Sequence, residues 1–215
     1  MPLTTWRPLA PEEMQGRGRE FADELARRRT VRQFSDREIP DGVLEDCLRA
    51  AASAPSGANL QPWHFVVVRD PALKHRIREA AEREEREFYA TAPAEWLEAL
   101  APLGTDDVKA YLDVAPALIA VFAERYGVRP DGTRVTHYYV QESVGIAMGI
   151  LIAALHHAGL VTLTHTPSPM GFLNEVLERP AREKAMLLLV VGFPAADATV
   201  PDIVRKPLNQ VTTWR

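Results

Sequence analysis

Short, nearly continuous apolar runs alternate along the chain with longer stretches in which apolar residues recur at helical spacing. Runs of that length with turn residues at both ends are typical of strands covered on both faces of a sheet. They predict strands at 64–68, 117–123, 160–164 and 186–191. The helical patterns predict helices at 18–29, 41–53, 70–89, 136–158 and 171–178, with two short helices within 90–112 separated at 102–104.

This alternation predicts an α+β fold, an α/β sandwich in which a central sheet is flanked by helices. Residues 1–17 mix Pro, Thr, Gly and Met without periodicity and are expected to form an N-terminal arm. Residues 18–215 have no internal repeat and no interdomain linker, and their length suits one domain. We therefore expect a single domain preceded by an arm.

Three local signals refine this prediction. Asp41 follows Pro40 and is a candidate N-cap for the helix at 41–53, and Asp70-Pro71 is the expected start of the next helix. The helix at 136–158 is apolar on most faces and should be central.

The C-terminal segment 200–215 contains proline, is extended in pattern and has an aromatic residue near its end. We expect this C-terminal extension to pack on a partner subunit, with 136–158 supplying the matching interface; a frayed terminus is the alternative.

Composition excludes several classes of protein. The net charge of −4 argues against a nucleic-acid partner. Cys47 is the only cysteine, which excludes an intrachain disulfide and argues against a thiolate metal site, so no metal is expected. No charged segment followed by an apolar run opens the chain, and the apolar run 144–155 is shorter than the roughly 20 residues of a bilayer span. We expect a cytoplasmic protein without a membrane partner.

Two segments suggest a flavin site. Arg28, Arg29 and Arg32 lie within five residues around Thr30, and the planar guanidinium suits bidentate contact with phosphate. The loop 54–60 is rich in Pro, Ser, Gly and Asn and precedes a strand, so its backbone amides can approach a planar ring. Together these segments predict a flavin mononucleotide (FMN) site. The alternative for the arginines alone is a solvated helix end.

A second constellation could bind an amino acid. Glu85 and Tyr89 are four residues apart in a helical pattern and therefore share a face. Lys109 follows two turn signals, so a segment that folds back could bring it close to them. The trio supplies a carboxylate for an ammonium group, and a cation and a hydroxyl for a carboxylate. The alternative is a solvated charged helix and a surface lysine.

In their order along the chain, four motifs support a resemblance to a known family. They are Arg-Arg-Thr-Val-Arg at 28–32, Ala-Pro-Ser-Gly-Ala-Asn at 54–59, Gln-Pro-Trp at 61–63 and Thr-His-Thr-Pro at 164–167. The ordered set resembles the FMN-dependent nitroreductase superfamily and, within it, the iodotyrosine deiodinases. The similarity covers roughly residues 24–212, including the tail motif from Thr199 to Leu208.

The resemblance implies the flavin contacts. Arg28, Arg29 and Arg32 would bind the phosphate and the pyrimidine edge of FMN with help from Thr30, and Arg205 would complete the phosphate site. FMN would lie in a homodimer interface, with Pro55 and Ser56 reaching it from the opposing subunit. Thr164, His165 and Thr166 would line the isoalloxazine, and the hydroxyl of Thr166, the expected catalytic group, would lie near N5. His165 departs from an all-threonine version of this segment.

The resemblance also implies the substrate and the reaction. Glu85, Tyr89 and Lys109 match a substrate lid at about 84–112, and the backbone N–H of Ala58 matches the contact to a phenolate oxygen. The implied reaction is reductive dehalogenation of halotyrosines, 3-iodotyrosine foremost with bromo- and chlorotyrosine, releasing halide and tyrosine. NAD(P)H would be the ultimate reductant, through a separate flavin reductase or other donor, because the chain has no G-x-G-x-x-G fingerprint.

Three alternatives remain open at this point. One is a broad-specificity nitroreductase that takes hydride directly from NAD(P)H. Another is a related flavin-cleaving enzyme, which has no need of a zwitterion-binding trio. The third is a non-catalytic protein that binds flavin or halotyrosine.

Overall fold

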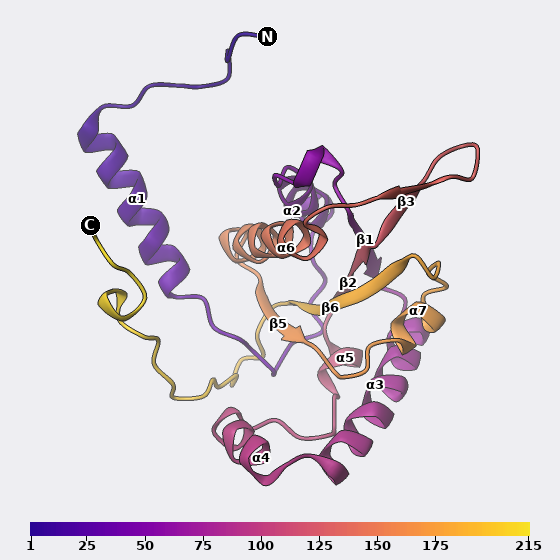
Figure 1. Ribbon diagram of the computed structural model, residues 1–215. Helices are drawn as coiled ribbons and strands as arrows, with labels where there is room; N and C mark the ends of the chain where they lie inside the picture. The colour runs from indigo at the N-terminus through magenta and orange to yellow at the C-terminus, as the bar shows by residue number, and fades with distance from the viewer.

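A four-stranded antiparallel sheet forms the centre of the computed structural model, which describes residues 1–215 (Figure 1). The strand order is β1-β2-β6-β5. The strands are β1 (Trp63–Val68), β2 (Ala117–Glu124), β5 (Val161–His165) and β6 (Glu183–Gly192). All four predicted strands are present, and the mixed α+β class is confirmed.

The sheet is covered on both faces, as its continuous apolar strands predict. Alternate residues of β2 enter two separate cores: Leu118, Ala120 and Phe122 pack on one side, and Ile119 and Val121 on the other. The first core is completed by α3 (Pro71–Thr91) and α7 (Phe172–Val176), and the second by α2 (Val43–Ala52) and α6 (Val140–His157). The sheet is therefore the middle layer of a sandwich.

The helix starts follow local chemistry, with one correction. Asp70 caps α3 as predicted, its Oδ1 accepting the N–H of Leu73 at 2.7 Å. The predicted N-cap Asp41 is wrong, because the cap of α2 is Gly42, whose φ of 82° turns the chain one residue later. By length and composition alone α6 could span a membrane, a test that the core helix of a soluble protein also passes.

Two short elements were not predicted. Strands β3 (Tyr126–Val128) and β4 (Arg134–Thr136) form a hairpin around the predicted turn at 129–133. Three-residue strands are too short to show a periodic pattern, so only their turn is visible in the sequence.

The segment between α3 and β2 folds back across the end of α3. It contains α4 (Ala94–Leu100), the 3₁₀ turn η2 (Ala101–Leu103) and α5 (Tyr111–Val114). The predicted break at 102–104 is only partly right: α4 continues into η2, and Gly104 ends it with a φ of 59°. The Trp96 ring packs edge-on against Phe88 of α3, with centroids 4.9 Å apart, and so holds α4 on α3.

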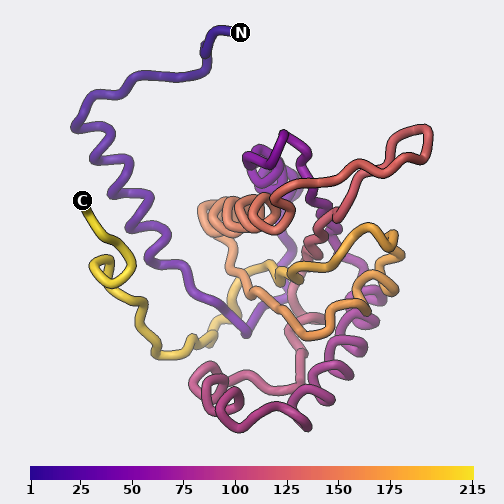
Figure 2. The backbone as a smooth tube through the Cα atoms, in the orientation of Figure 1, coloured from indigo at the N-terminus to yellow at the C-terminus, as the bar shows by residue number.

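The predicted arm is wrong in its extent. Residues 11–17 belong to α1 (Pro11–Ala26), which includes most of the helix predicted at 18–29 but begins seven residues earlier and ends three residues earlier. Pro11 lies in the first turn and Glu12 and Glu13 favour a helix N-terminus, and no residue of α1 is buried. Figure 2 shows α1 and the C-terminal segment, with its short 3₁₀ turn η3 (Leu208–Gln210), standing off the body of the domain.

One buried lysine anchors the end of the folded-back segment. The Nζ of Lys74 donates to the carbonyls of Asp113 and Ala115 at 2.9 and 2.8 Å, and the residue is 6% exposed. Burial lowers its pKa.

Replacing Lys74 by Met should lower the free energy of unfolding by about 1–3 kcal/mol, because buried carbonyls are left without donors. Urea denaturation measures the change, and Lys206→Met in the exposed tail is the matched control. Equal unfolding free energies for Lys74→Met and the parent would contradict the anchoring role.

Candidate functional site

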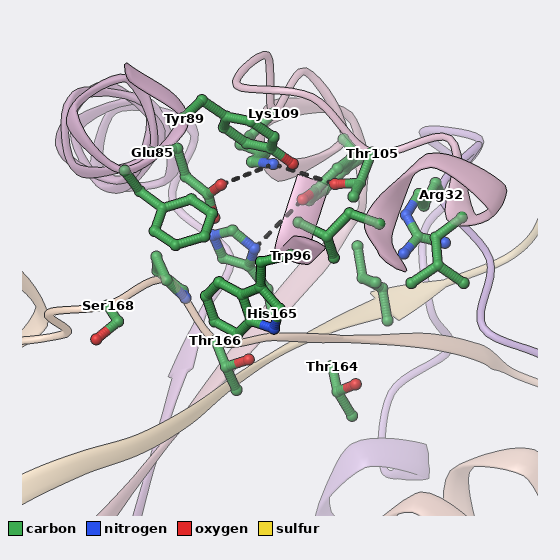
Figure 3. A pocket seen from close by; sticks show the side chains of 16 residues that line it. Arg32, Glu85, Tyr89, Trp96, Thr105, Lys109, Thr164, His165, Thr166 and Ser168 are labelled. Carbon is green, nitrogen blue, oxygen red and sulfur yellow. Dashed lines mark hydrogen bonds and ion pairs between the residues drawn. The ribbon is translucent and has the colours of Figure 1, made fainter. Parts of the chain in front are cut away.

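A cavity of about 220 Å³ lies between α3, the folded-back segment and the end of β5 (Figure 3). Seven predicted site residues line it, and one of them is Arg32. Glu85 and Tyr89 come from α3, Lys109 from the segment before α5, and Thr164, His165 and Thr166 from β5 and the residue after it.

The predicted trio is assembled and buried. Lys109 Nζ lies 3.3 Å from Glu85 Oε2, and the two side chains are 2% and 14% exposed. The same ammonium lies 5.7 Å from the centre of the Tyr89 ring. Burial raises the pKa of Tyr89, so its hydroxyl stays a hydrogen-bond donor. The alternative of a solvated helix and a surface lysine is therefore wrong.

Lys109 is positioned by a network that the sequence did not reveal. Its backbone N–H donates to Glu82 Oε1 at 2.8 Å, and Glu82 also accepts from Arg78 Nε at 2.7 Å. Arg78 in turn donates to Asp113 Oδ2 at 2.8 Å. Arg78, Glu82, Glu85 and Tyr89 recur at helical spacing on α3, so one face of this helix both holds the folded-back segment and lines the cavity. That spacing is the feature of the sequence from which Arg78 and Glu82 could have been assigned to the same face as Glu85 and Tyr89.

Strand alternation separates His165 from its neighbours. Thr164 and Thr166 are exposed whereas His165 is 5% exposed. Figure 3 shows His165 rising from β5 towards Glu85 and Lys109, with Thr164 and Thr166 below. Its Nδ1 lies 3.3 Å from the hydroxyl of Tyr111, a cavity-lining residue that sequence reasoning did not single out for the site.

Three arginines gather without a carboxylate partner. Arg205 Nη1 donates to the Ala26 carbonyl at 2.8 Å, and its other amino group donates to the carbonyl of Arg28. Arg29 donates to the carbonyl of Pro201. Burial and the charges of Arg205 and Arg29 lower the pKa of Arg28. Because no ion pair neutralises this cluster, its residues fit a phosphate group.

Arg28, Arg29 and Arg205 line neither the first cavity nor its neighbour, but Arg29 contacts Pro201, which lines the neighbour. A second cavity of about 340 Å³ is lined by Thr30, Arg32 and Pro201 among others, and Arg32 lines both cavities. Thr30 also forms a bridge with Thr162 of β5. A ligand with a phosphate at one end and a ring at the other fits this arrangement of residues.

The loop with Pro55, Ser56 and Ala58 does not meet the trio within one chain. Its Gln61 N–H donates to Ser56 Oγ at 2.9 Å, and its Gly57 N–H donates to Ser143 Oγ of α6 at 3.3 Å. Neither cavity is lined by this loop. In Figure 1 it follows α2, across the sheet from α4.

Comparison with known proteins agrees with this geometry. The model of the nitroreductase family matches residues 25–193. Among similar proteins, the iodotyrosine deiodinase of Haliscomenobacter hydrossis is 56% identical over 91% of this chain and 89% of its own. Iodotyrosine deiodinase 1 of Homo sapiens is 47% identical over 93% of this chain and 70% of its own.

A solved structure agrees as well. An oxidised iodotyrosine deiodinase bound to FMN and 3-iodo-L-tyrosine superposes with a TM-score of 0.79 and 31% identity, covering 90% of this chain and 100% of that one. The chain therefore belongs to the nitroreductase family, and its similarity within that family is to the iodotyrosine deiodinases.

Proposed function

We propose that the protein is an FMN-dependent oxidoreductase that removes halogen reductively from halotyrosines, 3-iodotyrosine foremost and bromo- and chlorotyrosine with it. The observation that carries the proposal is the buried Glu85–Lys109 pair beside Tyr89, in a cavity that also includes Thr166. Relatives named iodotyrosine deiodinase, and the related structure with FMN and 3-iodo-L-tyrosine, support it.

The trio suits an amino-acid zwitterion because it already contains both charges. Glu85 would take the ammonium group, and Lys109 and the Tyr89 hydroxyl would take the carboxylate. Residues 84–112 would act as the lid, and their contacts over the cavity would exclude water from the reacting ring. The halogenated ring would then lie on the side of Thr164 and Thr166.

FMN would be held by Arg28, Arg29, Arg205 and Arg32, with Thr30, and when bound it supplies the electrons that replace halogen by hydrogen. Thr166 would donate its hydroxyl hydrogen to N5, a hydrogen bond that tunes the electronics of the ring. NAD(P)H would be the ultimate reductant, directly or through a separate flavin reductase, and the cytoplasm is the expected compartment.

A homodimer would complete the site. The exposed face of α6 carries Gly145, Ile146 and Gly149, and the C-terminal segment exposes Leu208 and Trp214. These apolar surfaces suit a second copy of the chain. The partner's loop would then bring Pro55 and Ser56 to FMN and the Ala58 N–H to the phenolic oxygen.

The purified protein should be a yellow homodimer with about one FMN per subunit. Light scattering coupled to gel filtration measures the mass, and the absorbance of released flavin gives the stoichiometry. A colourless monomer that does not take up added FMN would refute both the flavin site and the dimer.

Dehalogenation is tested by adding 3-iodotyrosine to the dithionite-reduced protein without oxygen. We expect the flavin to reoxidise and iodide and tyrosine to appear. Fast NADPH oxidation by nitroaromatics with no response to iodotyrosine would favour the broad nitroreductase, and iodotyrosine binding without turnover would favour the non-catalytic protein.

A further inference from the structure

The buried ring of His165 has one nitrogen that no protein group satisfies. Its Nδ1 is paired with the Tyr111 hydroxyl at 3.3 Å, whereas Nε2 is buried and has no hydrogen-bond partner. A buried polar atom without a partner is costly in a folded protein, so it calls for an explanation.

The pairing with Tyr111 determines which nitrogen carries the hydrogen. If Nδ1 carried it, both the phenol hydrogen of Tyr111 and the lone pair of Nε2 would lack partners. If Nε2 carries it, Tyr111 donates to Nδ1 and only the Nε2–H remains unpaired. The second tautomer satisfies more groups and is the one we assign. Burial, together with the charge of Lys109, lowers the pKa of His165 to about 3, in keeping with a neutral ring.

An acceptor for this donor lies in the same cavity. Glu85 carries the only carboxylate among the residues that line it. In Figure 3 the imidazole of His165 lies below the Glu85 carboxylate and points towards it. In the structure Glu85 is committed to Lys109, with Oε2 at 3.3 Å from the ammonium.

The ammonium of Lys109 is already occupied by protein groups. Its Nζ donates to Thr105 Oγ1 at 3.4 Å and to the carbonyl of Asp106, and its charge is paired with Glu85 at 3.3 Å. A ligand carboxylate must therefore displace one of these partners. Glu85 is the partner to leave, because the ligand's own ammonium compensates its negative charge.

We propose that His165 is a positioning residue for Glu85: its Nε2–H, oriented by Tyr111, takes over the Glu85 carboxylate when an amino-acid zwitterion takes Lys109. This inference rests on the proposed function, because it assumes a zwitterionic ligand. Without His165, the Glu85 carboxylate would lose the Lys109 donor and would have only the ligand ammonium as a partner. Tyr111, His165 and Glu85 thus form a chain from the folded-back segment through β5 to α3.

Two substitutions separate the two nitrogens of His165. Asn places an acceptor near the position of Nδ1, so it keeps the partner of Tyr111 but loses the N–H donor at the position of Nε2. Gln places an N–H near the position of Nε2, so it keeps the donor for Glu85. Phe keeps the size of the ring and removes both nitrogens.

The dissociation constant of 3-iodotyrosine, measured by quenching of FMN fluorescence, is the readout. His165→Asn and His165→Phe should weaken binding about 10- to 100-fold, the value of a hydrogen bond to a charged group, and His165→Gln should stay within about threefold of the parent. Binding of 2-iodophenol, which lacks both charges, and FMN content should be unchanged in all three variants.

Several outcomes would overturn the proposal. Parent-like binding by His165→Phe, or parent-like binding by His165→Asn with weak binding by His165→Gln, would show that Nε2 does not act on Glu85. Equal weakening of iodotyrosine and 2-iodophenol would indicate a structural role. If the parent itself does not bind iodotyrosine, the proposed function fails together with this inference.

The parent protein provides a test that needs no variant. In protein labelled with ¹⁵N-histidine, the ¹⁵N shifts should identify His165 as the Nε2–H tautomer, and iodotyrosine should change the shift of Nε2 while Nδ1 stays an acceptor. An Nδ1–H tautomer, or no change at Nε2 in the complex, would overturn the proposal even if every variant failed to fold.

Discussion

Replacing Lys109 by Ala will weaken binding of 3-iodotyrosine by tens- to thousands-fold while FMN stays bound. The Lys109 side chain is 2% exposed and its ammonium lies 3.3 Å from Glu85, so its loss leaves a carboxylate uncompensated in a buried site. Removing one member of a desolvated charge pair costs about 2–5 kcal/mol. Glu85→Gln should weaken binding similarly, because the amide cannot neutralise the ligand ammonium.

Titration of FMN fluorescence with iodotyrosine and with 2-iodophenol measures both effects. The phenol has no zwitterion, so its affinity should be almost unchanged in either variant. Glu87→Gln, an exposed substitution on the same helix, is the control and should bind iodotyrosine as the parent does. If Lys109→Ala and Glu85→Gln also bind it as the parent does, the trio does not bind the zwitterion, and the broad-specificity nitroreductase becomes the better assignment.

The free energy of unfolding should fall steeply as the pH is lowered below about 6.5. His165 has its pKa lowered from 6.5 to about 3, first by burial and then by the charge of Lys109. The unfolded chain therefore binds a proton at pH values where the folded chain does not. The stability that neutral His165 contributes is complete above pH 6.5 and is lost progressively as the pH falls towards 3.

This one group contributes a slope of about 1.4 kcal/mol per pH unit within that window. Urea denaturation at pH 7, 6 and 5 measures it in the parent and in His165→Phe, whose slope should be flatter by that amount. All other ionisable side chains are the same in the two proteins, so the difference in slope isolates His165. His64→Gln, at an exposed histidine, should keep the parent's slope; equal slopes for His165→Phe and the parent would contradict the buried neutral ring.

The layered fold could be predicted from the sequence because its signals are local. Each buried strand is a run of apolar residues. In β2 these residues point alternately into the cores on the two faces of the sheet. Asp70-Pro71 marks a helix start through a single side-chain hydrogen bond. The resemblance likewise depended on short motifs, and it pointed to a trio that the structure brings together although Glu85 and Lys109 are far apart in the chain.

What the sequence could not reveal depends on contacts between distant segments. Helix α1 buries no residue, so burial against a core does not mark where it begins. The strands of the β3–β4 hairpin are too short to show periodicity. The burial of Lys109 follows from Glu82 holding its backbone, which is a tertiary contact.

The roles within the motif Thr164–Thr166 were also decided by tertiary structure. Alternation along β5 sends His165 to one side and its neighbours to the other, but only tertiary packing gives its Nδ1 the Tyr111 hydroxyl as a partner and places the imidazole in the same cavity as Glu85. Residue types and their spacing therefore determined the elements and the candidate groups. Burial and contacts between elements determined the charge state of each group and the partner that it faces.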